Sequence, residues 1–120
     1  MYGLIVHMPP RNSLGELELV VLMALMRADE GAHGAAIREE IAATTGRQVT
    51  PGAIYPTLDR LEQRGLVRSY MGDPVAERGG RAKRHFVLLK PGLVEVRRAW
   101  RQYAQLAAGL ESALGKGRAR

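Results

Sequence analysis

Residues 50 to 66 combine several features of a helix whose N-terminal end could bind nucleic acid; they read T-P-G-A-I-Y-P-T-L-D-R-L-E-Q-R-G-L. Thr50 is a good N-cap, and Pro51 stands at the first helical position, where its missing N–H loses no hydrogen bond. The free N–H groups of such an end suit a phosphate. Gly52 is small enough to let the helix end approach bases, and Tyr55 could contact a base edge, a thymine methyl group or a phosphate.

Helical periodicity divides this segment into an inner and an outer face. Ile54, Leu58 and Leu61 repeat at helical spacing and should face a core. The residues that are then turned outward or to the flanks are Gly52, Ala53, Tyr55, Pro56, Asp59, Arg60 and Gln63. Pro56 should bend or loosen the first turn, because it cannot donate a hydrogen bond to Gly52. We interpret the segment as a recognition helix, although a solvated amphipathic helix with Tyr55 half-packed has the same pattern.

A basic run, R-G-G-R-A-K-R-H, follows about fifteen residues later at residues 78–85. Its basic residues are Arg78, Arg81, Lys83, Arg84 and His85, around Gly79 and Gly80. Like charges this close repel each other, and contact with phosphates or insertion of Arg81 into a minor groove would relieve the repulsion. A solvated loop is the alternative. We favour DNA contact because the run follows a helix of the right kind.

Local signals around these features predict a mainly α fold with a small β-wing. The expected elements are a helix from Ser13, a helix over 34–45 ended by Gly46, a helix over 50–64 stopped by Gly65, strands over 66–71 and 85–89, and a last helix opened by Pro91 and Gly92. This order is that of a winged helix-turn-helix followed by a long C-terminal dimerisation helix. The expected organisation is a flexible N-terminal arm (1–12) or an upstream extension of a start near Met8, a DNA-binding domain (13–89), a dimerisation helix (91–114) and a basic disordered tail (115–120).

The last helix carries apolar residues at alternating steps of three and four, which is the seam of a coiled coil. Together with the apolar first helix it predicts a homodimer. The expected interface residues are Leu14, Leu17, Val21, Leu93, Val96, Trp100, Tyr103, Ala107, Leu110 and Leu114. Trp100 and Tyr103 could also form a pocket for a small planar hydrophobic effector. Plain dimer packing is the favoured interpretation, because apolar residues at seam spacing are chiefly core.

Composition narrows the classes of function. The chain has 120 residues, which suits one domain, and its net charge of +6 with a pI near 10.3 favours a polyanionic partner such as double-stranded DNA. It has no cysteine, so disulfides and thiolate chemistry are excluded, and a cytoplasmic location is expected. The longest apolar run, residues 19–26, is too short to span a bilayer, so we expect no membrane partner.

The histidines and carboxylates show no catalytic or metal-binding pattern. The three histidines lack ligand-like spacing to carboxylates, so we expect no metal and no cofactor. His33, just before Gly34, is expected to cap or flank the second helix, near a phosphate. No nucleophile–base grouping or phosphate-binding glycine loop stands out, and an enzyme is not expected.

Taken together, these motifs resemble the PadR family of transcriptional regulators. The resemblance rests on L-G-E-L-E-L-V-V-L-M-A-L in the first helix, the pair His33-Gly34, the segment T-P-G-A-I-Y-P-T-L-D-R-L-E-Q-R-G-L and E-R-G-G-R-A-K-R-H-F-V-L from Glu77. It covers about residues 14–114. The single C-terminal helix is similar to the short form of the family. Ala35 departs from the aromatic residue that many relatives carry after the H-G pair.

The resemblance implies a homodimer that binds a palindromic operator, usually as a repressor. It also implies that the residues at or near the groove are Thr50, Gly52, Ala53, Tyr55, Pro56 and Thr57, with 79–84 as the wing. Two alternatives remain beside a specific repressor. One is a dimeric adaptor that uses the winged fold to bind protein, and the other is a non-specific nucleic-acid binder without operator preference.

Overall fold

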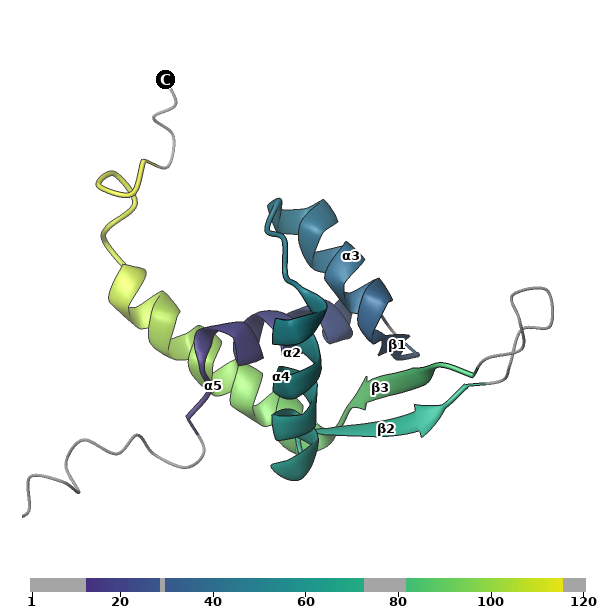
Figure 1. Ribbon diagram of the computed structural model, residues 1–120. Coiled ribbons are helices and arrows are strands. Elements are labelled where there is room, and N and C mark those ends of the chain that lie inside the picture. Colours follow the sequence, from purple (N-terminus) through teal and green to yellow (C-terminus); the bar gives the residue numbers. More distant parts are fainter. Residues whose placement is uncertain (1–12, 29, 73–81, 116–120) are drawn as a thin grey trace, which may run out of the picture.

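The computed structural model describes residues 13–28, 30–72 and 82–115. Its elements in chain order are α2 (Glu16–Arg27), β1 (Ala32–His33), α3 (Gly34–Thr45), α4 (Pro51–Gln63), β2 (Val67–Met71), β3 (Arg84–Leu88) and α5 (Lys90–Ala107). Four helices gather around one end of a small sheet, and β2 and β3 extend away from them (Figure 1). The predicted arm at 1–12, most of the predicted basic tail, and Arg78, Gly80 and Arg81 lie outside the described residues.

Helix α2 is the centre of the core, because it packs against α3, α4, α5 and β3. Val21, Leu22 and Leu25 are buried, as a helix that is apolar nearly all round requires. The helix begins at Glu16 rather than at the expected Ser13. The carboxylate of Glu18 caps its N-terminus by accepting a hydrogen bond from the Gly15 N–H (2.8 Å).

Helices α3 and α4 form the helix-turn-helix, and their ends agree with the local signals. Gly46 ends α3 in the left-handed conformation (φ 79°), which glycine adopts without steric cost. Thr50 caps α4, and its Oγ1 accepts from the Ala53 N–H (3.2 Å). Helix α4 runs through Pro56 without interruption, and Pro56 lies on its exposed side.

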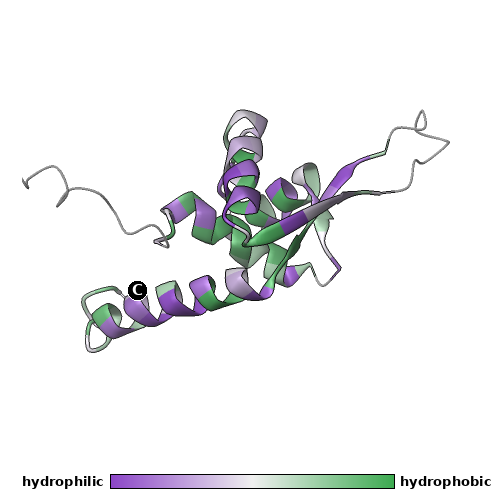
Figure 2. Cartoon of the chain, turned by 90° about the horizontal axis from the view of Figure 1, so that it is seen from below, coloured by the Kyte–Doolittle hydropathy of each residue, from purple (hydrophilic) through white to green (hydrophobic). Residues whose placement is uncertain are grey.

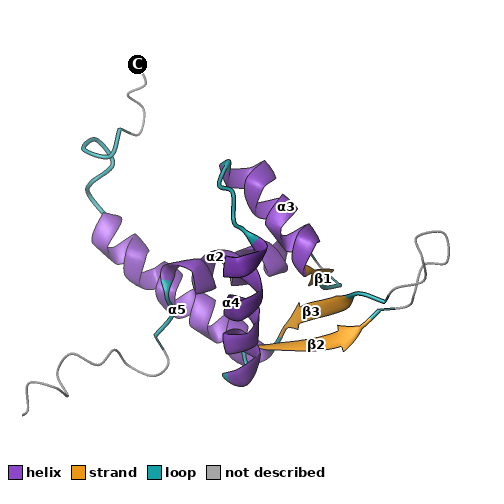
Figure 3. Ribbon diagram, in the orientation of Figure 1, coloured by secondary structure: helices purple, strands orange, loops and turns teal. Residues whose placement is uncertain are grey.

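The sheet has three antiparallel strands in the order β1-β3-β2, drawn in orange in Figure 3. Strand β1 is not among the elements that the sequence predicts. It pairs Ala32 with Phe86 and His33 with His85. The middle strand, β3, pairs with both β1 and β2, and its Phe86 is fully buried in the core. Strand β3 therefore connects the wing to the helix-turn-helix.

Helix α5 is shorter than the sequence pattern predicts. It ends at Ala107, and the expected helix to Leu114 is wrong. Gly109 has φ 84°, a conformation that does not continue a right-handed helix, so Leu110 and Leu114 lie beyond the helix. Figure 2 shows α5 reaching beyond the other helices with bands of hydrophobic and hydrophilic residues along it. Among the described helices, α5 included, none has the length and apolar character needed to cross a membrane.

Candidate nucleic-acid interface

The N-terminal half of α4 presents a continuous exposed surface. Pro51, Gly52, Tyr55 and Pro56 are exposed, and Ala53 is half-buried. The cap from Thr50 occupies one N–H of the first turn, while proline removes another. What remains is a backbone end without bulky side chains, which could lie close to the bases or the phosphates of a groove.

Tyr55 is held by the first residue of α3. Its ring and hydroxyl lie against Gly34, so closely that a Cβ at this position would overlap them. Tyr55 is nevertheless 42% exposed. The ring is thus half-packed and half-free, a combination that gives a contacting side chain a defined direction.

Thr57, which the resemblance implies lies near the groove, and Arg60, on the flank of α4, both make contacts within the protomer. Thr57 is 1% exposed, and its hydroxyl donates to the Ala53 carbonyl (2.8 Å), so it faces the core and cannot reach a groove. Arg60 turns back along the helix. Its Nη2 donates to the Thr57 hydroxyl (3.1 Å) and its Nε lies 3.6 Å from a Glu18 carboxylate oxygen.

His33 caps α3, as expected, because its Nδ1 accepts from the Ala36 N–H (3.1 Å). This role requires the neutral imidazole. Burial lowers the pKa of His33 below 6.5, and the nearby charge of Lys83 and the ring of His85 lower it further. The rings of His33 and His85 meet edge to face at 5.4 Å, so the start of α3 also touches the wing strand.

At the base of the wing, Lys83 and Arg84 are both exposed but differ in their contacts. Lys83 is exposed, and its carbonyl accepts from the Gly72 N–H (2.7 Å) across the two strands. Arg84 instead turns toward α4, where its guanidinium donates to Asp59 (3.1 Å) and Glu62 (2.5 Å). The expected free cation at 84 is therefore already paired within the chain.

Glu62 is a candidate site residue that the sequence analysis did not predict. Its second oxygen accepts from the Ser69 hydroxyl (2.7 Å) and the Ser69 N–H (3.1 Å). These bonds, together with the hydrogen bond and positive charge of Arg84, lower the pKa of Glu62 against the opposing effect of burial. The sequence signal is weak, because an acidic residue near the end of a helix gives no indication of a partner on a following strand.

The predicted dimer interface is partly internal to the protomer. Val21 is 0% and Val96 is 4% exposed, so both belong to the chain's own core and present no surface to a partner. By contrast, Trp100 (60%) and Tyr103 (54%) on α5 are exposed. These two side chains are therefore accessible to a partner or a ligand, as the prediction requires.

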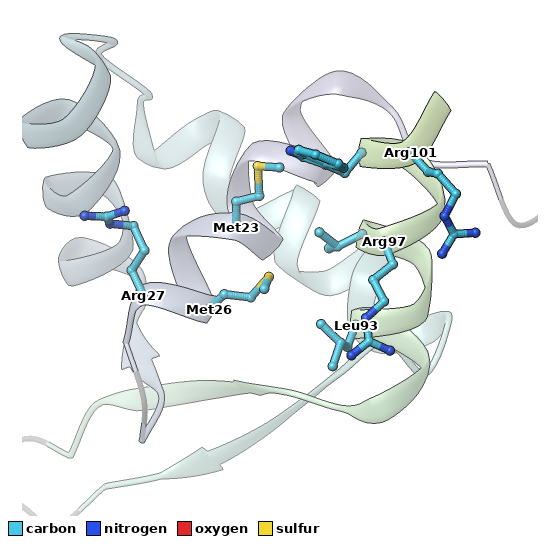
Figure 4. A pocket seen from close by; sticks show the side chains of 8 residues that line it. Met23, Met26, Arg27, Leu93, Arg97 and Arg101 are labelled. Carbon is cyan, nitrogen blue, oxygen red and sulfur yellow. The ribbon is translucent and has the colours of Figure 1, made fainter. Parts of the chain in front are cut away.

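A groove of about 640 Å³ lies between α2 and α5. Its lining consists of Met23, Met26, Arg27, Leu93, Val96, Arg97, Trp100 and Arg101. Figure 4 shows Met23 and Met26 from α2 facing Leu93 and Arg97 from α5. Tyr103 does not line it, so the structure separates the two residues of the predicted pocket. Within the described ranges, no cluster of three or more histidine, aspartate or glutamate side chains could hold a metal ion.

Comparison with known proteins agrees with this geometry. The sequence model of the transcriptional regulator PadR-like family matches residues 21–98. Transcriptional regulator Rv3488 of Mycobacterium tuberculosis (strain ATCC 25618 / H37Rv) is 39% identical over 88 residues, which are 71% of this chain and 78% of that protein.

Solved structures support the fold at lower identity. A PadR family transcription regulator from Clostridium difficile R20291 has a TM-score of 0.67 at 17% identity, covering 84% of this chain and 100% of that chain. One from Eggerthella lenta DSM 2243 has a TM-score of 0.64 at 24% identity, covering 85% and 88%. On the family match, the relative and the winged fold, the chain belongs to the PadR-like family of transcriptional regulators, which are DNA-binding proteins and not enzymes.

Proposed function

We propose that the protein is a homodimeric repressor that binds a two-fold symmetric operator through the N-terminal half of α4 and its basic wing. The exposed, small-residue end of α4 with Tyr55 held on Gly34 carries this proposal. Basic residues beside it would supply affinity through phosphate contacts, and the helix end would supply sequence preference. A DNA partner agrees with the expected cytoplasmic location.

The dimer follows from surface that one chain leaves uncovered. Trp100, Tyr103 and Leu106 on α5 are all more than half exposed, and Leu106 reaches 77%. Apolar side chains exposed together on one helix gain free energy when a partner buries them. Two winged domains related by a two-fold axis would then address half-sites about 34 Å apart, or a small multiple of that spacing.

Fluorescence anisotropy on the DNA upstream of the protein's own gene tests this proposal. Scrambled DNA of equal length, at two salt concentrations, is the control. A specific repressor should prefer the operator by about a thousandfold or more. Equal binding of both DNAs that fades with salt would indicate a non-specific binder, and no binding at either salt would favour the protein-binding adaptor.

Two variants should affect sequence preference and overall DNA affinity separately. Tyr55→Ala should reduce the ratio between operator and scrambled DNA, because Tyr55 lies where bases would be read. Lys83→Gln should weaken binding to both DNAs about equally, and it should reduce the slope of log affinity against log salt by about one.

The groove between α2 and α5 supports a second role, the binding of an effector. Its lining joins apolar side chains to Arg97 and Arg101, and neither arginine forms an ion pair with another residue in the ranges 13–28, 30–72 and 82–115. A planar hydrophobic molecule, most favourably one with a carboxylate, fits this chemistry. Quenching of Trp100, the single tryptophan, by such compounds would support binding, and its absence for both anionic and neutral compounds would argue against it.

A further inference from the structure

One arginine and two carboxylates join α4 to the base of the wing. Arg84, the first residue of β3, donates from Nη1 to Asp59 and from Nη2 to Glu62. The two carboxylates lie three residues apart on α4, so they share one side of the helix. A guanidinium can bridge them because its N–H groups form a rigid fork.

The other strand at the base of the wing, β2, is also hydrogen-bonded to Glu62. Glu62 also accepts two hydrogen bonds from Ser69 on β2, one from the backbone and one from the hydroxyl. A single carboxylate of α4 therefore contacts both β2 and β3. We call this set of residues, Asp59, Glu62, Ser69 and Arg84, the wing clamp.

Charge alone gives no reason for carboxylates at this position. Asp59 and Glu62 lie on the helix proposed to enter a groove, where negative charge would repel phosphates. Arg84 and Lys83 are both exposed, but the charge of Arg84 is neutralised by these two carboxylates. A phosphate would have to compete with two carboxylates for this guanidinium.

We propose that Arg84 is a positioning residue that sets the angle between α4 and the wing through Glu62 and Asp59, instead of contacting phosphate. This inference rests on the proposed DNA binding through α4 and the wing. The clamp holds two contact elements in one geometry before DNA arrives, so less freedom is lost on binding.

Glu62→Gln gives opposite results under the two interpretations. Removal of a negative charge near phosphates should tighten binding if electrostatics alone acts. Loss of the clamp should instead weaken operator binding, by roughly two- to fivefold for an exposed ion-pair network. Asp59→Asn should act in the same direction and more weakly, because Asp59 accepts from Arg84 only, whereas Glu62 also accepts from Ser69 on β2.

Arg84 and Lys83 form a matched pair for the salt dependence. Arg84→Gln should weaken operator binding while the slope of log affinity against log salt stays at the wild-type value, because no phosphate contact is lost. Arg84→Lys keeps the charge but not the fork, and should weaken binding nearly as much. A slope reduced by about one in Arg84→Gln, with wild-type affinity in Arg84→Lys, would assign Arg84 to a phosphate and overturn the proposal.

Hydrogen exchange without DNA separates this proposal from the function on which it rests. The Ser69 amide, which donates to Glu62, should exchange faster in Glu62→Gln than in the wild type. Unchanged exchange, or tighter operator binding by this variant, would overturn the clamp. Failure of the wild type to bind DNA would overturn the proposed function, and the exchange rates would still decide the clamp.

Discussion

The contact between Gly34 and Tyr55 leads to a prediction with a definite sign. Gly34 begins α3 with an ordinary negative φ, so Gly34→Ala would normally stabilise the protein by about 0.4–1 kcal/mol through the unfolded chain. Here the new Cβ would come closer than 3.0 Å to three atoms of Tyr55. Overpacking of this kind costs about 1–3 kcal/mol.

The second effect is the larger, so Gly34→Ala should destabilise the protein by about 1–2 kcal/mol. The tyrosine is the cause, and Tyr55→Ala removes it. In the Tyr55→Ala background, the same change at Gly34 should become neutral or stabilising. The coupling between the two substitutions should then reach about 2 kcal/mol, well above the additivity error of about 0.5 kcal/mol.

Urea unfolding of the four proteins at one fixed protein concentration measures this coupling, since the stability of the proposed dimer would depend on concentration. Gly52→Ala is the matched control. Its Cβ would meet nothing closer than 3.9 Å, so it should not depend on Tyr55. If Gly34→Ala stabilised the protein equally with and without the tyrosine, Gly34 would not hold the ring and the reasoning would be refuted.

Three further predictions concern other positions. Gly92→Ala should destabilise by about 3 kcal/mol in urea unfolding, because its Cβ would overlap the backbone oxygen of Leu66, which cannot move aside; stability equal to the wild type would contradict this contact. His33→Asn keeps a capping acceptor that does not titrate. Because burial lowers the pKa of His33, the unfolded chain binds its proton more readily, so His33 contributes stability that is complete above about pH 6.5 and is lost as the pH falls. Unfolding measured between about pH 7 and pH 5 should therefore decline less in His33→Asn than in the wild type, and equal declines would exclude this role. Gly109→Ala should increase helicity in far-UV circular dichroism by extending α5, since alanine disfavours the left-handed conformation by about 1–2 kcal/mol; an unchanged spectrum would mean that other contacts end the helix.

Much of the fold was predictable because its signals are local. The cap at Thr50 and the left-handed glycine at Gly46 each act within a few residues, and both are confirmed. Strand β1 was not predictable in this way, because two residues form a strand only through pairing with β3. Thr57 was assigned to the groove through the family resemblance, although its place between the core residues Ile54 and Leu58 indicates a buried side chain.

The candidate site likewise has features that local sequence signals predict and features that depend on distant contacts. The exposed end of α4 follows from helical periodicity, which needs no knowledge of distant partners. The pairing of Arg84 with Asp59 and Glu62, 25 and 22 residues earlier in the chain, depends on how β3 packs against α4. A basic run shows where positive charge lies along the sequence, and only the fold shows which of its members is already neutralised.

The pairing of β1 with β3 also has a consequence for how the protein is made. His33 and His85 are partners, so the chain between them, with both helices of the helix-turn-helix, is a loop closed by the sheet. Closing a loop of this length carries an entropic cost that local contacts within α3 and α4 do not share. During synthesis, α3 and α4 can form early, but their anchor is complete only when β3 has left the ribosome. A nascent chain that ends before residue 84 would contain α3 and α4 without the strand that anchors them.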